Sequence, residues 1–542
     1  MNTKMAKETL KQLKLENPCG CGGSGTRLHA LPILVALFLL PGLKVVAQTG
    51  NQPEPAIEPK YIEIPVETVI DKIRGGMLGQ MIGNLNGLPH EMAYIAEPGN
   101  VKNYIPSLQN GAWTDDDTDF EWVYIVTMQK SRNAFLSGDT IAKLWKERMN
   151  RNIWCANRYS RYLMDLGIKP PYTGYTALSP WADFNVSGQF LCETYGLLAP
   201  AMPQTAAKIG LNYTTAAIDN EPAQTTQLFA TMISTAVVEN DIKKVIDAGL
   251  AAMDPKSKAL QVCRDVINWY AEYPDNWKET RRLLKEKYTQ EDNNIRDKNG
   301  FELNTGSVIA ALLYGMGDFS ETLKAAFNFG WDADCTAATS GTIIGVIQGY
   351  RWMMSQGWQI VDRYRNTTRE NMPMDETITG FCDRLIDLFE MINEKNGGKK
   401  ELVNNVLVYR ILQEKPKPIL SLSSVEEQKQ QLIKGLEETI TKNLQNENRQ
   451  ERASAAYMAV CLDLNASLSQ KYPRQWKEAC YELRGYWKVM QNIFNEQTGE
   501  FRGLLNLKNK FLAAGFKVPA AIYSDNELYN DPEVWKKPIY QN

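Results

Sequence analysis

Four aspartates stand within five residues in the first quarter of the chain. The segment reads Trp113-Thr114-Asp115-Asp116-Asp117-Thr118-Asp119. Aspartate is favoured in the first turn of a helix, and Thr118 with Glu121 fits a capping box, so capping explains one or two of these carboxylates. Packing four of them together costs on the order of 1 kcal/mol of repulsion per close pair in water. Because a bound divalent cation is the usual remedy, we interpret the segment as part of a metal site.

A second acidic pair occurs much later in the chain. The segment reads Gly330-Trp331-Asp332-Ala333-Asp334-Cys335-Thr336 and leads into an alanine- and glycine-rich helical pattern. Aspartates at alternate positions of a turn can point at one centre, where oxygen ligands suit Mg²⁺, Mn²⁺ or Ca²⁺. Cys335 is either a soft metal ligand or a small buried residue, and the second interpretation is favoured. Asp332 and Asp334 are therefore the second candidate half of a metal site.

Two other acidic motifs fit less well. An EF-hand loop that began at Asp115 would need glycine at its sixth position and a bidentate glutamate at its twelfth, where the chain has Phe120 and Val126. An aspartyl-phosphate phosphatase would use Asp332 as its nucleophile. That enzyme class needs a hydrophobic strand directly before the motif, whereas a Gly-Trp pair precedes it here. The phosphatase is kept as a minor alternative.

The overall composition excludes several other chemistries. His29 and His90 are the only histidines, so histidine-based zinc chemistry and a Ser-His-Asp triad are nearly excluded. The cysteines beyond residue 47 are widely spaced without a CxxC pattern, so neither a zinc knuckle nor a dense disulfide framework is predicted. Sixty basic and 63 acidic residues give a formal net charge of -3. Since no basic cluster stands out, nucleic acid is not an expected partner.

Residues 1–47 have the pattern of an export signal. Basic residues precede an apolar run from Leu31 to Leu43, and Val45-Val46-Ala47 offers the small residues that signal peptidase accepts. The run is too short to span a bilayer, which takes about 20 residues in a helix. An uncleaved anchoring helix is the alternative. We predict an exported protein, periplasmic or secreted, without stable membrane insertion after cleavage.

The elements that must position the aspartates follow a helical period from about residue 66 onward. Val66, Ile70, Ile73 and Met77 share one helix face. Similar stripes recur over 138–150, 221–238, 241–253, 257–272, 276–288, 305–316, 319–329, 335–354 and 377–395. Alternating patterns typical of strands are rare, so the predicted fold class is all-α.

Other segments interrupt this pattern. Residues 170–204 contain too many prolines and glycines for a long helix and are predicted to be loops near a functional mouth. After Gly397-Gly398 the chain is more charged, with helical stretches around 425–445, 451–465 and 473–494, as in a second small domain or a packing extension of the first. The predicted division is a signal peptide (1–47), a flexible leader (48–65), a catalytic domain (66–396) and a helical C-terminal extension (397–542).

Two helical segments carry glycine at every fourth position. The glycines are Gly75, Gly79, Gly83 and Gly87 in the first segment, and Gly341, Gly345 and Gly349 in the second. Residues four apart share one face of a helix, so each segment presents a smooth groove that another backbone can approach closely. This predicts tight helix packing beside both acidic clusters.

The order of these motifs resembles the ADP-ribosylglycohydrolase superfamily. The resemblance runs from about residue 66 to 352 and rests on Arg74–Asn84, Pro89-His90-Glu91, Asp116-Asp117-Thr118, Gly330–Asp334 and Gly341. It implies a compact, orthogonal multi-helix all-α fold that holds two Mg²⁺ or Mn²⁺ ions between the aspartate motifs. It also implies hydrolysis of an N- or O-glycosidic bond at a ribosyl or ribose-like sugar by a metal-activated water. The implied partner is a small-molecule, glycan or nucleoside-like substrate.

The resemblance also implies roles for individual residues. The implied metal ligands are Asp115, Asp116, Asp117, Asp332 and Asp334. The implied catalytic residues are Glu91, Asp116 and Asp332, where Glu91 matches a glutamate that some members place over the scissile bond. An alternative for Glu91 is an ordinary surface or capping carboxylate. The residues expected to contact substrate are Asn84, Trp113, Trp331 and Cys335.

Three positions depart from the family pattern. Asn84 replaces the usual aspartate after the last helix glycine, Asp115 stands where the family has threonine or serine, and Cys335 replaces a threonine. These departures bear on the second metal position and suggest a substrate other than ADP-ribosylarginine. Export points the same way, since ADP-ribosylated proteins are chiefly intracellular. A catalytically inactive relative that serves as a binding or structural protein is the main alternative.

Overall fold

The computed structural model describes residues 59–289, 300–494, 502–523 and 537–541. The predicted signal peptide and most of the predicted leader lie outside these residues. From Pro59 onward the chain forms one compact unit. Within the described residues, no helix is both long enough and apolar enough to cross a membrane.

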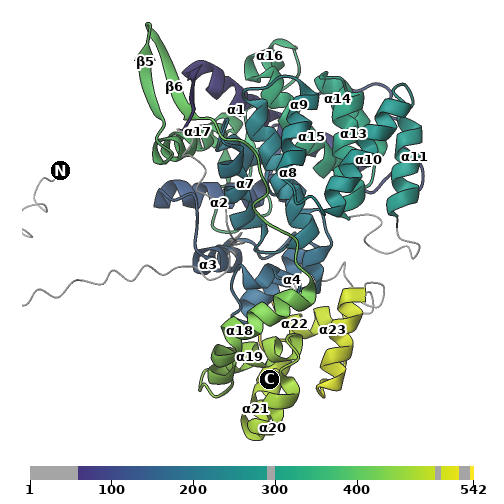
Figure 1. Ribbon diagram of the computed structural model, residues 1–542, viewed down its shortest axis with the longest axis vertical. Coiled ribbons are helices and arrows are strands. Elements are labelled where there is room, and N and C mark those ends of the chain that lie inside the picture. Colours follow the sequence, from purple (N-terminus) through teal and green to yellow (C-terminus); the bar gives the residue numbers. More distant parts are fainter. Residues whose placement is uncertain (1–58, 290–299, 495–501, 524–536, 542) are drawn as a thin grey trace, which may run out of the picture. The chain divides into compact units, whose positions relative to one another are not determined.

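Helices dominate the described residues, which confirms the all-α fold class (Figure 1). The longer helices are α1 (Val66–Gly87), α2 (Asp116–Ser131), α3 (Gly138–Arg148), α4 (Cys155–Asp165), α7 (Pro203–Thr214), α8 (Asn220–Ala236), α9 (Ile242–Ala251), α10 (Lys258–Glu272), α11 (Trp277–Tyr288), α13 (Phe301–Tyr314), α14 (Phe319–Phe329), α15 (Ala333–Gln348), α17 (Ile378–Lys395), α18 (Val425–Leu444), α19 (Arg449–Cys461), α21 (Pro473–Gly485), α22 (Trp487–Phe494) and α23 (Arg502–Ala513). The short ones are α5 (Ser187–Phe190), α6 (Glu193–Leu197), α16 (Tyr350–Ser355), α20 (Asn465–Lys471) and the 3-10 turns Leu88–His90, Tyr172–Gly174 and Pro180–Asp183.

The predicted helical stripes all coincide with helices, although one stripe is divided. The stripe over 335–354 becomes α15 and α16, because Gly349 between them adopts a φ of 84°. Such a left-handed conformation ends a helix and suits glycine.

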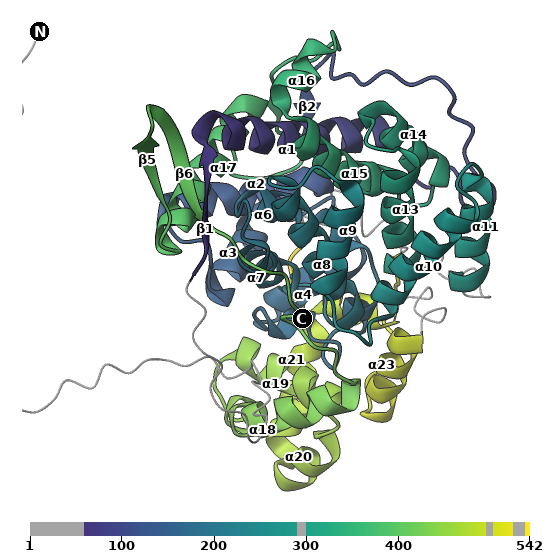
Figure 2. The same ribbon diagram turned by 45° about the horizontal axis from the view of Figure 1, so that its top comes forward.

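The glycine-rich helices α1 and α15 pack directly against each other, as their spacing predicted (Figure 2). A Cβ atom on Gly79 would lie 2.1 Å from the carbonyl oxygen of Gly341, and one on Gly83 would lie 2.1 Å from that of Ala337. At the end of α1, a Cβ on Gly87 would lie 2.4 Å from the Cα of Asp334. The packing therefore brings the last turn of α1 against the second aspartate motif.

Two small sheets lie among the helices. β1 (Tyr61–Pro65) pairs antiparallel with β6 (Val406–Leu412), and β6 pairs with β5 (Lys399–Val403). The last residues of the predicted leader are thus a strand, and the predicted helical extension begins with a hairpin. Such short strands give too few alternations of apolar and polar residues for a clear sequence signal.

The second sheet joins β2 (Ala112–Trp113), β3 (Tyr364–Arg365) and β4 (Asp375–Glu376). The boundary at residue 397 stays a prediction.

The C-terminal helices share an apolar core with α4 and with residues 168–184. Within this core the hydroxyls of Tyr159 and Tyr457 share a hydrogen bond of 2.7 Å, and Tyr457 donates to the carbonyl oxygen of Leu178. Most of 170–204 is buried. Between residues 170 and 202 the chain has only short helices and 3-10 turns, as its prolines and glycines predicted, although most of its aromatic and aliphatic side chains pack inward. Its position near a functional mouth stays a prediction.

Candidate metal centre

The two aspartate motifs meet at the N-terminal ends of α2 and α15. Three groups of side chains each have ligand atoms within 4.8 Å of one another: Asp117, Asp334 and Cys335; Glu91, Asp332 and Asp334; and Asp115, Asp116 and Asp117. Because Asp117 and Asp334 each belong to two groups, all the predicted metal ligands form one connected cluster. The partial positive charge at a helix N-terminus favours carboxylates in the first turn, and here two such ends face one site.

Asn84, near the end of α1, forms hydrogen bonds with two carboxylates of the first motif. Its Nδ2 donates to Oδ2 of Asp115 and to Oδ2 of Asp117, each at 2.9 Å, and its side chain is fully buried. Asn84 therefore contacts two carboxylates of the cluster, and its contact with substrate stays a prediction. Cys335 is also buried, and its thiol lies 3.5 Å from Oδ2 of Asp117. Burial raises the pKa of this thiol well above its usual value, so it stays protonated.

Three buried oxygen atoms of the cluster have no hydrogen-bond partner: Oδ1 of Asn84, Oδ1 of Asp117 and Oδ1 of Asp334. Leaving one buried polar atom unpaired costs about 1–3 kcal/mol. Burial, and then repulsion from neighbouring carboxylates, raises the pKa of Asp116, Asp117 and Asp334 well above the usual range. A cation would satisfy the two carboxylate oxygens and offset the repulsion, so the residues present fit an oxygen-ligated divalent metal.

The fourth aspartate of the first motif has a different partner. Asp119 is fully buried, forms an ion pair of 2.7 Å with Nε of Arg369, and accepts a hydrogen bond from the Thr368 hydroxyl. Burial raises its pKa to about 6, while Arg369 and Thr368 act in the opposite direction. Asp119 thus anchors the base of α2 and leaves the other three aspartates of the motif for the cluster.

Glu121 does not serve in the capping box that the sequence suggested. Its Oε2 accepts from Nε2 of Gln80 at 2.8 Å, and its Oε1 accepts from the backbone N–H of Thr194 at 2.9 Å. Glu121 and Glu193 are both fully buried, and burial followed by repulsion from Glu193 raises the pKa of Glu121 well above its usual value. The Glu193 carboxyl accepts from the Thr339 hydroxyl at 2.6 Å. Burial raises its pKa to about 8. Behind the metal cluster lies a second acidic pair that needs a proton.

We expect Glu193→Gln to make stability less sensitive to pH. The carboxyl pKa is about 8 in the folded protein and near 4.3 in unfolded chains. Its contribution to stability is therefore complete below pH 4 and is lost as the pH rises through 8, a loss of up to about 5 kcal/mol. Glutamine cannot ionise, and its amide can donate to Glu121. Urea unfolding at pH 5 and pH 8 should show a smaller fall in the free energy of unfolding for the variant, while exposed Glu437→Gln should behave like the wild type. Equal falls in all three proteins would contradict the assignment.

Glu91 lies at the solvent-facing side of the cluster. The residue as a whole is exposed, yet its carboxyl turns toward Asp332 and Asp334. Surrounding protein shields this carboxyl from water, Asp332 and Asp115 add repulsion, and together they raise its pKa to about 8. An acid whose pKa lies near neutral pH is suited to proton transfer.

The two tryptophans predicted to contact substrate have different environments. Trp113 is partly buried in β2 and packs against the main core. The Trp331 indole is only 1% exposed and lies under the guanidinium of Arg281, with 4.4 Å between the guanidinium carbon and the ring centroid. Trp331 therefore packs against Arg281 in this structure, and its contact with substrate stays a prediction.

Arg281 is a site-supporting residue that the sequence did not reveal. From α11 its Nε donates to the carbonyl oxygen of Phe329, and its Nη2 donates to that of Tyr94, both at 2.8 Å. Gly330 and Trp331, directly before Asp332, have positive φ angles of 79° and 56°. The guanidinium thus holds a strained turn that aims the second aspartate motif. A single arginine far away in the sequence gives no signal of such a role.

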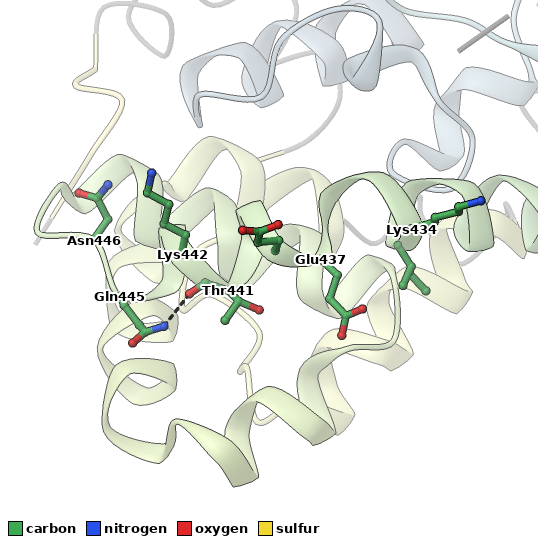
Figure 3. A pocket seen from close by; sticks show the side chains of 8 residues that line it. Lys434, Glu437, Thr441, Lys442, Gln445 and Asn446 are labelled. Carbon is green, nitrogen blue, oxygen red and sulfur yellow. Dashed lines mark hydrogen bonds between the residues drawn. The ribbon is translucent and has the colours of Figure 1, made fainter. Parts of the chain in front are cut away.

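A wide hollow of about 840 Å³ lies far from this cluster in sequence, on α18. Figure 3 shows Lys434, Glu437, Thr441 and Lys442 along this one helix. Every lining residue belongs to α18 or directly follows it, so no second element brings converging groups. The aspartate cluster, where several elements converge, is the better candidate site.

The all-α fold and the carboxylate cluster between two helix N-termini define a class of metal-binding helical proteins. The sequence profile of the family described as ADP-ribosylglycohydrolase matches residues 65–395. The chain belongs to this family, whose members are generally metal-dependent, and membership indicates glycohydrolase activity. A solved structure described as "ADP-ribosylglycohydrolase-related protein complex" is similar to 60% of this chain and 99% of its own, with 16% identity and a TM-score of 0.38. No curated protein matches the sequence.

Proposed function

We propose that this protein is a glycohydrolase that depends on Mg²⁺ or Mn²⁺ and cleaves an N- or O-glycosidic bond at a ribosyl or ribose-like sugar. The main support for the proposal is the cluster itself, in which carboxylates from two helix N-termini lie close together. Two of their buried oxygens, Oδ1 of Asp117 and Oδ1 of Asp334, have no hydrogen-bond partner. A purely structural protein gains nothing from gathering so much unpaired acid, because the repulsion lowers its stability.

The chain offers ligands for one or two cations. Asp117 and Asp334 are shared between groups, so they are the central ligands, with Asp115, Asp116 and Asp332 around them. A bound cation supplies Lewis acidity, which polarises an oxygen and stabilises developing negative charge. Asp116 and Asp332 keep the catalytic roles that the family resemblance implies, and they are also ligands of the cation.

Glu91 is proposed as the group that moves the proton. Its carboxyl lies at the exposed side of the cluster, where a substrate would approach. Its pKa is about 8 without a cation, and a cation bound beside it would lower this pKa and leave a carboxylate that can accept a proton. In this role it takes the proton of the attacking water at its carboxylate oxygen. The buried pair behind the cluster has no access to substrate and takes no part.

The proposed export from the cytoplasm narrows the range of candidate substrates. The signal pattern of residues 1–47 supports export to the periplasm or the medium. A nucleoside-like or furanosidic compound from the environment fits that location better than an ADP-ribosylated protein does. N-terminal sequencing of the exported protein is expected to begin at Gln48, and an intact N-terminus after fractionation would reject export by cleavage.

The proposed activity is tested with a substrate panel. The purified protein is incubated with ADP-ribose adducts, nucleosides and aryl furanosides in Mg²⁺, Mn²⁺ or EDTA, and free sugar is measured. We expect release from at least one substrate class that requires the cation. If no sugar is released and no cation raises the melting temperature, the chain is an inactive relative. Metal-dependent release of phosphate from p-nitrophenyl phosphate, lost in Asp332→Asn, would instead support a phosphatase.

A further inference from the structure

We propose that Asn84 is a positioning residue that ties Asp115 to Asp117 and keeps the inner side of the metal cluster from carrying another negative charge. The inference rests on the proposed function, because it concerns how this site binds a divalent cation. It goes beyond the predicted ligands, among which Asn84 has no place.

The hydrogen bonds of Asn84 support this role. One nitrogen donates to two carboxylates at the same distance, 2.9 Å, so both amide hydrogens are used. One turn earlier on α1, Gln80 donates from its Nε2 to the backbone oxygen of Asp117 at 2.8 Å. Residues four apart share a helix face. Two amides on one face of α1 therefore hold the first turn of α2.

The backbone of α1 cannot shift to relax these bonds. Gly83 and Gly87, on either side of Asn84, lie directly against the backbone of α15, where even one methyl group would clash. The Asn84 amide is thus fixed relative to both aspartate motifs. A rigid donor of this kind aligns the carboxylates before a cation arrives, which lowers the cost of binding.

The contact between Asn84 and Asp115 joins one donor to one acceptor. Asn84 is fully buried and neutral, whereas the carboxylate stands at the partly buried Asp115. If the two side chains were exchanged, the pair would still have one donor and one acceptor, but the carboxylate would then stand at the fully buried position.

The test measures the dissociation constant for Mn²⁺ by electron paramagnetic resonance and the melting temperature of the metal-free protein. Asn84→Ala is expected to weaken Mn²⁺ binding by about 10–100-fold, as for other residues that hold ligands in place. Asn84→Asp is expected to melt lower without metal, because three carboxylates then share one buried contact. The exchange variant Asn84→Asp/Asp115→Asn restores one donor and one acceptor and should recover most of the melting temperature and affinity. Asn86→Ala, which loses an amide on the same helix that binds the backbone oxygen of Ser107, is the control with unchanged affinity.

The outcomes separate this inference from the proposed function. If the wild type binds no Mn²⁺, the proposed function fails. If the wild type binds Mn²⁺ and Asn84→Ala binds it equally well, only the positioning role is wrong. If Asn84→Ala does not fold, the comparison of Asn84→Asp with the exchange variant decides, and an exchange variant no better than Asn84→Asp rejects the coupling.

Discussion

Replacing Gly79 with alanine is expected to destabilise the protein by about 3 kcal/mol or more, and replacing it with valine is expected to prevent folding. The added Cβ would lie 2.1 Å from the oxygen and 2.7 Å from the carbon of the Gly341 carbonyl. Both are backbone atoms of α15, so the clash is relieved only if the two helices separate. Because Asn84 on α1 binds the first aspartate motif and α15 carries the second, any separation also moves the two motifs apart. Thermal and urea unfolding of the alanine variant measure the effect.

Gly435 provides the matched control for this prediction. It lies within α18, and a Cβ built there meets no atom within 4 Å. Alanine in an open helical position stabilises a protein by about 0.5–1 kcal/mol relative to glycine. The same substitution should therefore have opposite signs at the two sites. If both variants are stabilised, the close packing of α1 on α15 is wrong.

The variant Asp334→Asn is expected to melt higher than the wild type without metal and to lose both metal-induced stabilisation and turnover. Asp334 is 3% exposed, its Oδ1 has no partner, and it repels Asp332 and Asp117. Removing its charge relieves about 1 kcal/mol or more of repulsion. A cation at 100 times its dissociation constant stabilises the wild type by about 2.7 kcal/mol. This gain should disappear in the variant, with turnover reduced by about 10³-fold.

A higher melting temperature without metal, together with the loss of metal-induced stabilisation and turnover, distinguishes a functional carboxylate from a structural one. Differential scanning fluorimetry with and without Mn²⁺, together with the sugar-release assay, measures both. Asp247→Ala, at an exposed carboxylate on α9, is the control and should change neither quantity. A lower melting temperature for metal-free Asp334→Asn would show that the carboxylate stabilises the fold, and the cation-site interpretation would lose its main support.

The sequence predicted the helices and the meeting of the aspartate motifs for a clear physical reason. Long helices repeat their apolar positions many times, so α8, α10 and α17 are visible as stripes. Glycines at every fourth position predicted close packing because only a residue without a side chain allows two backbones to touch. Clustered aspartates predicted a metal site because their repulsion needs compensation.

The remaining features depend on contacts between residues that are far apart in the sequence. Glu121 looked like a capping residue, and only the fold shows that it faces Glu193. Arg281 and Trp331 are ordinary residues until α11 brings the guanidinium over the indole. The stretch 170–204 contains the prolines and glycines of a surface loop, yet it is mostly buried, first against the C-terminal helices and then in the main core. Local patterns do not encode such tertiary burial.

The central claim is that the aspartates at the N-terminal ends of α2 and α15 hold the catalytic cation. Diffraction from crystals grown with Mn²⁺, recorded near the manganese absorption edge, tests this claim most directly. We predict an anomalous peak bounded by oxygens of Asp117 and Asp334, at about 2.0–2.5 Å from its ligands. Manganese peaks only elsewhere, in protein that hydrolyses its substrate, would contradict the account.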